Sequence, residues 1–262
     1  MGVVARTKYM SFTNQHIWLI GASTGIGAQL ARDLAVAGAK LSLSSRDQTK
    51  LEALKSELKG DGHGVYPLDV TQQTSVDVAW VALNKAHGMP DMVIYNAGAY
   101  EPMSATRYDA DTAIMVADTN FMGAFRVLEP VLPAFMARCQ GHIVLTGSLA
   151  GMKGLPNAIG YGASKAGIIH LAENLRLDLA GSGIKVQLVN PGFVKTRLTD
   201  KNEFNMPFLL TPEDASARIM KGLLSDRFEI NFPKRLTVLI KALRYMPDRL
   251  YYKLLRNKPA KN

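Results

Sequence analysis

The segment YGASK, residues 161–165, places a tyrosine four residues before a lysine within a predicted helix that runs to about residue 180. Residues i and i+4 share one face of an α-helix, so the two side chains are expected to lie side by side. A neighbouring cation favours the ionised form of a phenol and would lower its pKa from about 10. Tyr161 and Lys165 are therefore a candidate pair for proton transfer, although the same spacing also occurs on ordinary solvated helices.

A second candidate site follows the first predicted strand. The sequence GASTGIG, residues 21–27, contains Gly21, Gly25 and Gly27 and leads into a predicted helix over residues 25–38. Glycine lets the backbone approach a pyrophosphate closely, and the N-terminus of a helix offers free N–H groups and the positive end of its dipole. Because the turn joins a strand to a helix, it predicts a dinucleotide phosphate site, with an ordinary tight turn as the alternative. The spacing is G-x-x-x-G-x-G, which differs from the more common G-x-G-x-x-G.

The elements that would position these residues alternate between strands and helices. Apolar runs predict strands at residues 16–21, 40–45, 64–70, 91–98, 141–148, 184–192 and 227–232. Helical patterns cover residues 25–38, 49–60, 75–88, 107–138 with an interruption near Pro130 and Pro133, 161–180 and 211–225. This alternation predicts an α/β fold: a single doubly wound, Rossmann-like parallel sheet of about seven strands with helices on both faces. We expect an N-terminal extension at residues 1–13, a dinucleotide-binding catalytic domain at 14–232 and a basic amphipathic tail at 233–262.

Six motifs occur in order, and most stand where a predicted strand ends. The glycine loop is followed by Asn96-Ala97-Gly98, by Asn120, by Ser148 thirteen residues before Tyr161, by the Y-x-x-x-K pair, and by Pro191-Gly192 with Thr196. In this arrangement the chain resembles the short-chain dehydrogenase/reductase family over residues 14–232. The resemblance implies an NAD(P)-dependent oxidoreductase that transfers a hydride between nicotinamide and a carbonyl or alcohol.

The resemblance also implies a role for each catalytic residue. Tyr161 would be the general acid–base, with its pKa lowered by Lys165 and by the oxidised nicotinamide ring. Lys165 would also hydrogen-bond the nicotinamide ribose, Ser148 would polarise the substrate oxygen, and Asn120 would hold a water that links Lys165 to solvent. Two alternatives are a non-catalytic nucleotide-binding scaffold at a membrane and an epimerase or dehydratase on the same fold.

The expected cofactor is NADP, with NAD as the less favoured option. The second predicted strand ends with Ser45 and Arg46, and a guanidinium suits a 2′-phosphate better than the acid that would bind a free ribose 2′-hydroxyl. Asp47 is expected to cap the next helix, and Asp69 to contact the adenine or to cap a helix. The full set of expected cofactor contacts is Gly21, Ser23, Thr24, Gly25, Ile26, Gly27, Ser45, Arg46, Asp69, Val70, Asn96, Ala97, Gly98, Tyr161, Lys165, Pro191, Gly192, Val194 and Thr196.

The loop after Pro191-Gly192 is expected to cover the substrate. Phe204, Met206, Phe208 and Leu209 would form an apolar lid, which favours a bulky or lipophilic carbonyl or alcohol as the small-molecule substrate. Ordinary packing of a loop on its domain is the alternative.

Charge and composition narrow the class of protein further. The net charge of the 262 residues is +9, and nine basic and two acidic residues lie within residues 229–262. The basicity therefore belongs to the tail, which argues against nucleic-acid binding by the whole protein. The five histidines show no ligand spacing and there is one cysteine, so no metal site is expected. Neither a signal-peptide pattern nor an apolar run of about 18 residues is found, so a cytoplasmic protein is predicted.

The tail reads as two short amphipathic helices, residues 236–246 and 247–257, divided at Pro247. Three interpretations are open: peripheral contact with an anionic membrane through residues 234–262, packing on its own domain or another subunit, and binding of an acidic partner such as an acyl carrier protein. The family resemblance also implies a homo-oligomer.

Overall fold

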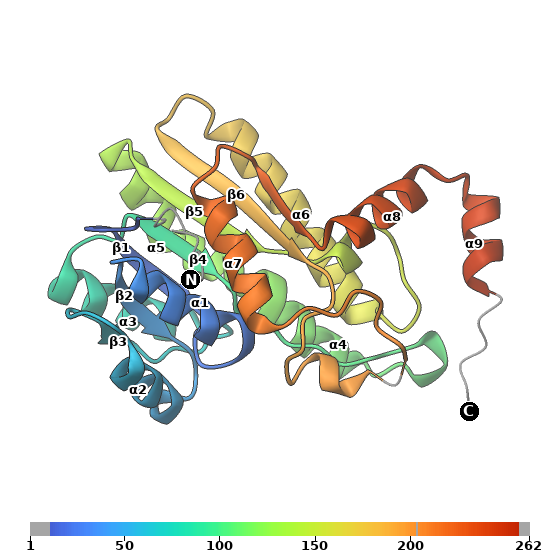
Figure 1. The fold of residues 1–262 in the computed structure, drawn as a ribbon, viewed down its shortest axis with the longest axis horizontal. Coiled ribbons are helices and arrows are strands. Elements are labelled where there is room, and N and C mark those ends of the chain that lie inside the picture. The colour runs from blue at the N-terminus through green and yellow to red at the C-terminus, as the bar shows by residue number, and fades with distance from the viewer. Residues whose placement is uncertain (1–10, 203, 257–262) are drawn as a thin grey trace, which may run out of the picture.

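The computed structural model describes residues 11–202 and 204–256. It confirms the predicted fold, a seven-stranded sheet in the order β3-β2-β1-β4-β5-β6-β7 with every pair parallel (Figure 1). The strands are β1 (His16–Ile20), β2 (Lys40–Ser44), β3 (Gly64–Val65), β4 (Met92–Tyr95), β5 (Gly141–Thr146), β6 (Ile184–Pro191) and β7 (Glu229–Phe232). The strand order reverses between β1 and β4, and such a switch point is where doubly wound sheets bind ligands.

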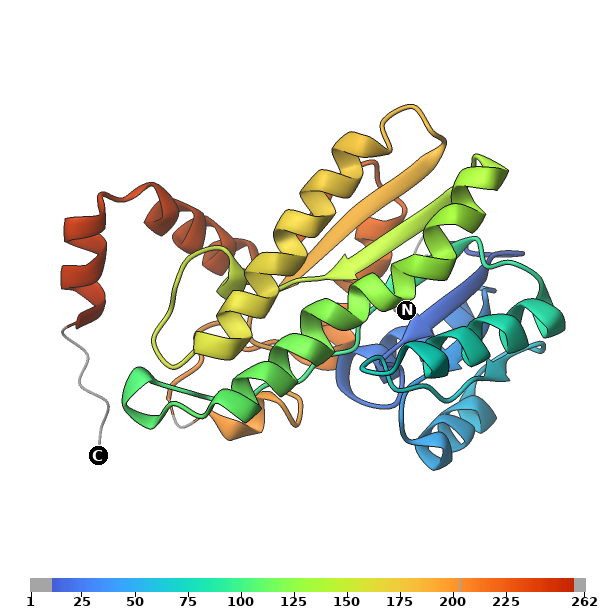
Figure 2. The ribbon, with the colours of Figure 1, turned by 180° about the vertical axis from the view of Figure 1, so that it is seen from behind.

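Helices cover both faces of the sheet. They are α1 (Gly25–Val36), α2 (Gln48–Glu57), α3 (Gln73–His87), α4 (Ala110–Ala117), α5 (Gly123–Arg138), α6 (Ile159–Asp178), α7 (Pro212–Leu223), α8 (Lys234–Tyr245) and α9 (Asp248–Arg256). The first core cluster packs α3, α5 and α6 on one face, and the second packs α1, α2 and α7 on the other. Figure 1 is viewed from the α1 and α7 side, and Figure 2 from the α5 and α6 side.

The position of β1 in the sheet explains why its sequence is apolar throughout. Side chains alternate between the two faces of a strand, and helices cover both faces of this sheet. Trp18 and Ile20 therefore lie in the core under α3 and α5, whereas Ile17 and Leu19 lie in the core under α1. All four are completely buried, which fixes β1 at the centre of the molecule.

Two sequence-based boundaries were wrong. The third strand, expected over residues 64–70, is confined to Gly64–Val65. The helix expected to break near Pro130 and Pro133 continues through both, and the irregularity lies earlier, in a π-helical segment at Asp118–Met122. Pro130 cannot donate to the carbonyl oxygen of Arg126, four residues before it. The side-chain amide of Gln73 donates to that oxygen instead, at 3.2 Å, so the helix keeps this carbonyl paired.

The tail forms the two expected helices, α8 and α9, and Pro247 lies between them. Leu236 and Ile240 of α8 join the core cluster of α3, α5 and α6. No helix in the described part of the chain is long and apolar enough to cross a membrane. Of the expected N-terminal extension, residues 1–10 lie outside the described residues, and Phe12 is buried in the core. The expected domain boundaries stay predictions.

Candidate active site

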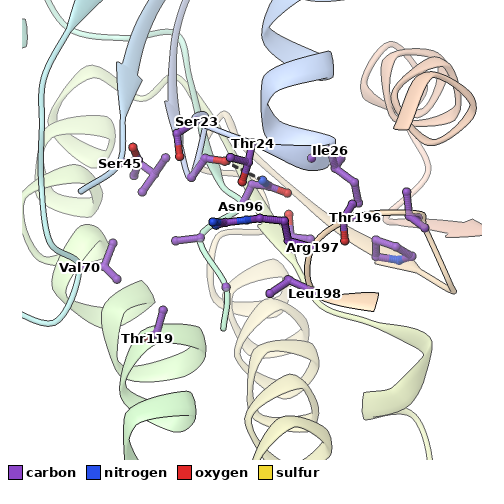
Figure 3. Close-up of a pocket in the computed structure, with 18 of the residues that line it drawn as sticks. Ser23, Thr24, Ile26, Ser45, Val70, Asn96, Thr119, Thr196, Arg197 and Leu198 are labelled. Atoms are coloured by element: carbon purple, nitrogen blue, oxygen red, sulfur yellow. Dashed lines mark hydrogen bonds between the residues drawn. The ribbon is translucent and has the colours of Figure 1, made fainter. Parts of the chain in front are cut away.

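Two cavities meet at the carboxyl ends of the strands. The larger, of about 410 Å³, runs from the glycine loop to α6 (Figure 3). The smaller, of about 140 Å³, lies between the loop that precedes α6, the loop that follows β6, and α8. Tyr161 lines both cavities.

The glycine loop is built for close backbone approach. Gly21 has a φ of +84°, in the region that favours glycine. A Cβ on Gly27 would lie 2.0 Å from the carbonyl oxygen of Gly21, so the start of α1 packs directly on the loop. The side-chain amide of Asn96 donates to that same oxygen at 3.1 Å and ties the end of β4 to the loop. Gly27 therefore supports the cavity from behind, whereas Gly21 and Gly25 line it.

Charged side chains line the end of the cavity beside β2. Arg46 lies there with Arg197 from the loop after β6, and with Lys50 and Asp47, whose ammonium and carboxylate groups are paired with each other. Asp47 caps α2 as expected, because its side chain accepts from the backbone N–H of Lys50 at 3.0 Å. Hydrogen bonding from Lys50 holds the pKa of Asp47 below its usual value. The hydroxyl of Ser45 is buried and has no partner among the described residues, so a ligand oxygen could satisfy it.

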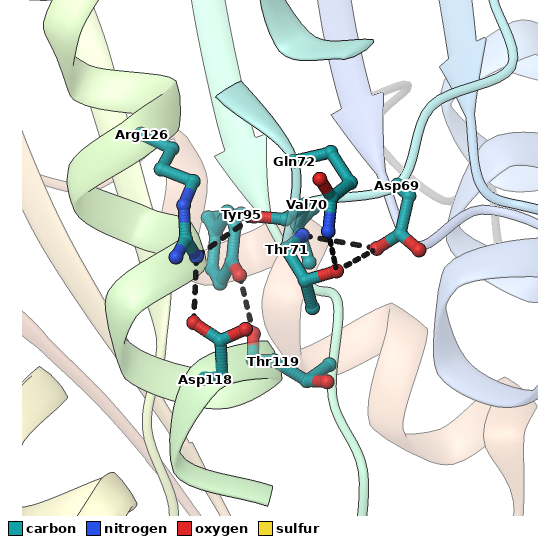
Figure 4. A network of polar contacts seen from close by, with 8 residues as sticks. All are labelled: Asp69, Val70, Thr71, Gln72, Tyr95, Asp118, Thr119 and Arg126. Atoms are coloured by element: carbon teal, nitrogen blue, oxygen red, sulfur yellow. Dashed lines mark hydrogen bonds and ion pairs between the residues drawn. The ribbon is translucent and has the colours of Figure 1, made fainter. Parts of the chain in front are cut away.

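A polar network supports the part of the cavity wall that follows β3 (Figure 4). Oδ1 of Asp69 accepts from the backbone N–H and the hydroxyl of Thr71, so Asp69 shapes the turn before α3, and the N-cap of α3 is Gln72. Arg126 donates to Asp118 at 2.7 Å and to the Val70 carbonyl oxygen at 3.3 Å. The turn that carries Asp69 and Val70 is thereby fixed to the helices that follow β4.

Tyr161 and Lys165 share the inner face of α6, as the i, i+4 spacing predicts. Nζ of Lys165 is buried, donates to the Thr146 carbonyl oxygen at 2.8 Å and lies 5.8 Å from the centroid of the Tyr161 ring. Burial lowers the pKa of Lys165 to about 8. Burial raises the pKa of Tyr161, and a hydrogen bond with Ser148 partly offsets this rise. The Lys165 ammonium group is directed to the Thr146 carbonyl oxygen, and the expectation that Lys165 lowers the Tyr161 pKa stays a prediction.

Ser148 and Asn120 lie on either side of this pair. Ser148 follows β5, its hydroxyl accepts from the backbone N–H of Ala150 at 3.1 Å, and it lines the smaller cavity beside Tyr161. Asn120 is completely buried in the π-helical segment. Its side chain accepts from the N–H of Ala99 at 2.6 Å and donates to the Ala99 carbonyl and to Ser164. Asn120 thus ties the loop after β4 to α6, and its expected role in holding a water stays a prediction.

The structure brings nearly all of the predicted cofactor residues to the larger cavity, and Gly27 is the one that lies behind its lining. The lining residues among them are Gly21, Ser23, Thr24, Gly25, Ile26, Ser45, Arg46, Asp69, Val70, Asn96, Ala97, Gly98, Tyr161, Lys165, Pro191, Gly192, Val194 and Thr196. Other lining residues were not predicted from the sequence, among them Lys50, Thr119 and Arg197. Arg197 directly follows Thr196, so a cation next to a predicted cofactor contact was the available signal.

The smaller cavity is mainly apolar. None of its described lining residues carries a charge. Its polar groups are Ser148 and Tyr161 together with Tyr100, Thr199 and Asn202. The ring of Tyr100 meets that of Tyr161 edge to face at 4.9 Å, and its hydroxyl donates to Asn202 at 2.6 Å. Of the four apolar residues expected to form a lid, only Phe204 lines this cavity, and half of its surface is exposed. Met206, Phe208 and Leu209 are not among the lining residues, and Phe208 and Leu209 are exposed.

Comparison with known proteins identifies the family. A model of the family described as short chain dehydrogenase matches residues 15–206. A protein of Myxococcus xanthus named "uncharacterized oxidoreductase" is 38% identical over 233 residues, 88% of this chain and 92% of that protein. A similarly named protein of Staphylococcus haemolyticus is 31% identical over 205 residues, 78% of this chain and 89% of that protein. This chain therefore belongs to the short-chain dehydrogenase family of NAD(P)-binding oxidoreductases.

Solved structures agree with this assignment. The closed form of a serine dehydrogenase in complex with NADP⁺ is 28% identical with a TM-score of 0.73, over 82% of this chain and 91% of that chain. A short chain dehydrogenase/reductase family protein, 24% identical with a TM-score of 0.72 over 81% of this chain and 93% of that chain, shares the fold.

Proposed function

We propose that this protein is an NADP-dependent reductase or dehydrogenase that acts on neutral, apolar carbonyl or alcohol substrates, with Tyr161 as its general acid–base. The observation that carries this proposal is the position of Tyr161 at the junction of the two cavities. Lys165 lines the larger cavity and Ser148 the smaller one. One phenol thereby faces both the expected place of the dinucleotide and the expected place of the substrate.

The residues of the larger cavity fit a dinucleotide phosphate. Gly21 and Gly25 leave the backbone of the loop bare, and the N-terminus of α1 points at the cavity. Arg46 and Arg197 supply positive charge, whereas Lys50 is paired with Asp47, and the Ser45 hydroxyl, unpartnered among the described residues, supplies a hydrogen bond. This set supports NADP over NAD, because an acid is not the residue that ends β2. A fluorescence titration should give a dissociation constant for NADPH well below that for NADH.

In carbonyl reduction the bound nicotinamide would supply the hydride. The raised pKa of Tyr161 keeps its phenol protonated at neutral pH, so Tyr161 would donate its proton to the developing alkoxide while Ser148 donates a hydrogen bond to the same oxygen. Lys165, charged below about pH 8, would hold the ribose and favour the phenolate that remains. We also propose that Asn120 positions the water that returns the proton.

The test is the substitution Tyr161→Phe. We expect turnover of a neutral ketone with NADPH to fall by at least about 100-fold, because general acid catalysis contributes about that much or more. The dissociation constant for NADPH should stay within about twofold, since the ring remains. Tyr252→Phe, on an exposed tyrosine, is the matched control. Normal turnover by the Tyr161→Phe variant would overturn the proposal.

The apolar smaller cavity supports the substrate class. A charged substrate would find no opposite charge among its described lining residues, and burying an unpaired charge is costly. We expect neutral aryl and alkyl ketones to be reduced with a higher kcat/KM than keto acids of similar size. Loss of NADPH absorbance over a matched panel measures this directly.

We further propose a cytoplasmic homo-oligomer. Exposed apolar side chains on α5 and α6, including Phe125, Met136 and Leu177, support a subunit contact there. Light scattering on the purified protein would give its mass, and a monomer at micromolar concentration would contradict this point.

The outer surface of the tail supports peripheral contact with an anionic lipid surface. Val238, Leu239, Leu250, Tyr252 and Leu254 are exposed there, beside the basic side chains of α8 and α9. Sedimentation with phosphatidylserine vesicles tests this contact, with phosphatidylcholine vesicles as the control. Equal sedimentation with both would contradict it.

A further inference from the structure

One wall of the smaller cavity comes from outside the region that the family model matches. The match ends at residue 206, whereas Leu236 and Ile240 of α8 line the cavity. Both side chains are at least nine-tenths buried. Leu236 also packs against the turn after β6, where a Cβ on Gly192 would lie 2.8 Å from its Cδ2. The tail thus supplies part of the cavity wall that would contact the substrate.

The opposite wall is formed by the loop that precedes α6, and α9 holds this loop. Leu149, Leu155 and Pro156 of the loop line the cavity. The hydroxyl of Tyr251 donates to the carbonyl oxygen of Gly154 at the middle of the loop. Tyr251 is only 1% exposed although α9 lies at the end of the molecule (Figures 1 and 2). Burial of this ring and its hydrogen bond fasten the tail to the loop.

Lys153, which precedes Gly154 in the loop, makes two further contacts with α9. Nζ of Lys153 lies 4.8 Å from the centroid of the Tyr251 ring and 3.1 Å from a carboxylate oxygen of Asp248. The Asp248 side chain is mostly exposed, so the ion pair contributes little by itself. The aromatic contact is shielded by the buried ring and orients the lysine. Tyr251 is therefore the main anchor.

We propose that α8 determines the substrate specificity of this enzyme. We also propose that α9 acts as a latch, by which we mean that it holds the loop at residues 149–158 in a fixed position relative to α8. This inference rests on the proposed function. Ile240 and Leu236 set the size of the group that fits beside Tyr161, and Tyr251 is a positioning residue that acts through the loop. The substrate group that reaches α8 is apolar, because the cavity at that end presents aliphatic side chains.

The test of α8 compares Ile240→Ala with Val238→Ala. Val238 lies on the same helix but is 69% exposed, so its substitution changes helix composition without changing the cavity. With NADPH, we expect Ile240→Ala to shift the ratio of kcat/KM for a bulky aryl ketone to that for a small aldehyde by about tenfold or more. Val238→Ala should leave the ratio unchanged, and both variants should bind NADPH like the wild type. Ile240→Val, which removes one methyl group, gives a smaller shift if the alanine variant folds poorly.

The outcomes separate the two proposals. An unchanged ratio in Ile240→Ala and Ile240→Val, with the wild type active on the panel, would overturn the specificity role alone. An equal shift in Val238→Ala would overturn it as well. Absence of turnover by the wild type on every carbonyl, despite NADPH binding, would overturn the proposed function and this inference with it.

The latch is tested by Tyr251→Phe, with Tyr252→Phe as its matched control on the exposed neighbour. Removing the hydroxyl leaves the ring buried but frees the Gly154 carbonyl. We expect KM for the bulky ketone to rise about fivefold, as loss of one hydrogen bond of about 1 kcal/mol predicts, with the dissociation constant for NADPH unchanged. An unchanged KM in Tyr251→Phe, or an equal rise in Tyr252→Phe, would contradict the latch.

Discussion

At the scale of single residues, burial controls the chemistry of the site. Lys165 is buried and Tyr161 is partly buried, and the two pKa values move in opposite directions, because burial disfavours the phenolate and the ammonium alike. The result is a neutral phenol and a lysine that is still mainly charged at pH 7. A neutral phenol can donate a proton, which is the role that the proposed carbonyl reduction requires of Tyr161.

The lowered pKa of Lys165 predicts pH-dependent cofactor binding. Lys165 is charged below about pH 8 and loses its proton above it, so its positive charge is available to the cofactor only on the acidic side. Between pH 8 and 9.5 the dissociation constant for NADPH, measured by fluorescence, should rise by up to about tenfold per pH unit. Lys165→Arg stays charged over this range and should show a flatter profile. A flat profile in the wild type would contradict the prediction.

At the scale of elements, irregular segments carry functional side chains. The π-helical turn at Asp118–Met122 places Thr119 at the larger cavity and Asn120 against the loop after β4. Extra residues in a helix are costly and occur often at functional sites. By contrast, α5 continues through Pro130 without a break. Pro130 cannot donate to the Arg126 carbonyl oxygen, and the side-chain amide of Gln73 in α3 donates to it instead. Contacts between elements thus decide where a helix deviates.

Capping is the element-scale feature that is simplest to test. Thr211 precedes α7, and its hydroxyl accepts from the backbone N–H of Asp214 at 3.1 Å. We expect Thr211→Ala to reduce the free energy of unfolding by about 1 kcal/mol, since it leaves that N–H unpaired. Thr211→Ser keeps the hydroxyl and should cost clearly less. Urea unfolding gives both values, and equal losses in the two variants would show that the cap does not stabilise α7.

At the scale of the whole molecule, the doubly wound sheet brings remote segments to one edge. Parallel strands all end on the same side, so the segments that follow them meet at this edge. These segments are the glycine loop, the turn at Asn96-Ala97-Gly98, Ser148, α6 and the turn after β6. The same sheet buries polar side chains between its layers. His142 of β5 lies beside Lys185 of β6, and burial lowers its pKa to about 3.

His142 predicts a loss of stability in acid. The unfolded chain binds a proton at His142 below about pH 6.5, whereas the folded chain does not until about pH 3. Stability is therefore lost as the pH falls through this interval, at about 1.4 kcal/mol per pH unit for this one group. His142→Gln should reduce the slope of unfolding free energy against pH between 6 and 4.5. His170→Gln, at an exposed histidine, should leave it unchanged. An unchanged slope in His142→Gln would contradict the prediction.

The sequence by itself determined the sheet and its order of elements, and its resemblance to a family pointed to most residues of the larger cavity. The sheet and the glycine loop follow from local signals: apolar runs for buried strands, glycine at turns that need a positive φ, and the fixed spacing of Tyr161 and Lys165 on a helix. Only the tertiary structure decided the pKa values of Tyr161 and Lys165, because the residues that bury them and the Thr146 carbonyl come from segments distant along the chain. The same is true of the smaller cavity. No local pattern marks Leu236, Ile240 or Tyr100 as its walls, since their role arises from packing between the tail, the loop before α6 and the loop after β4.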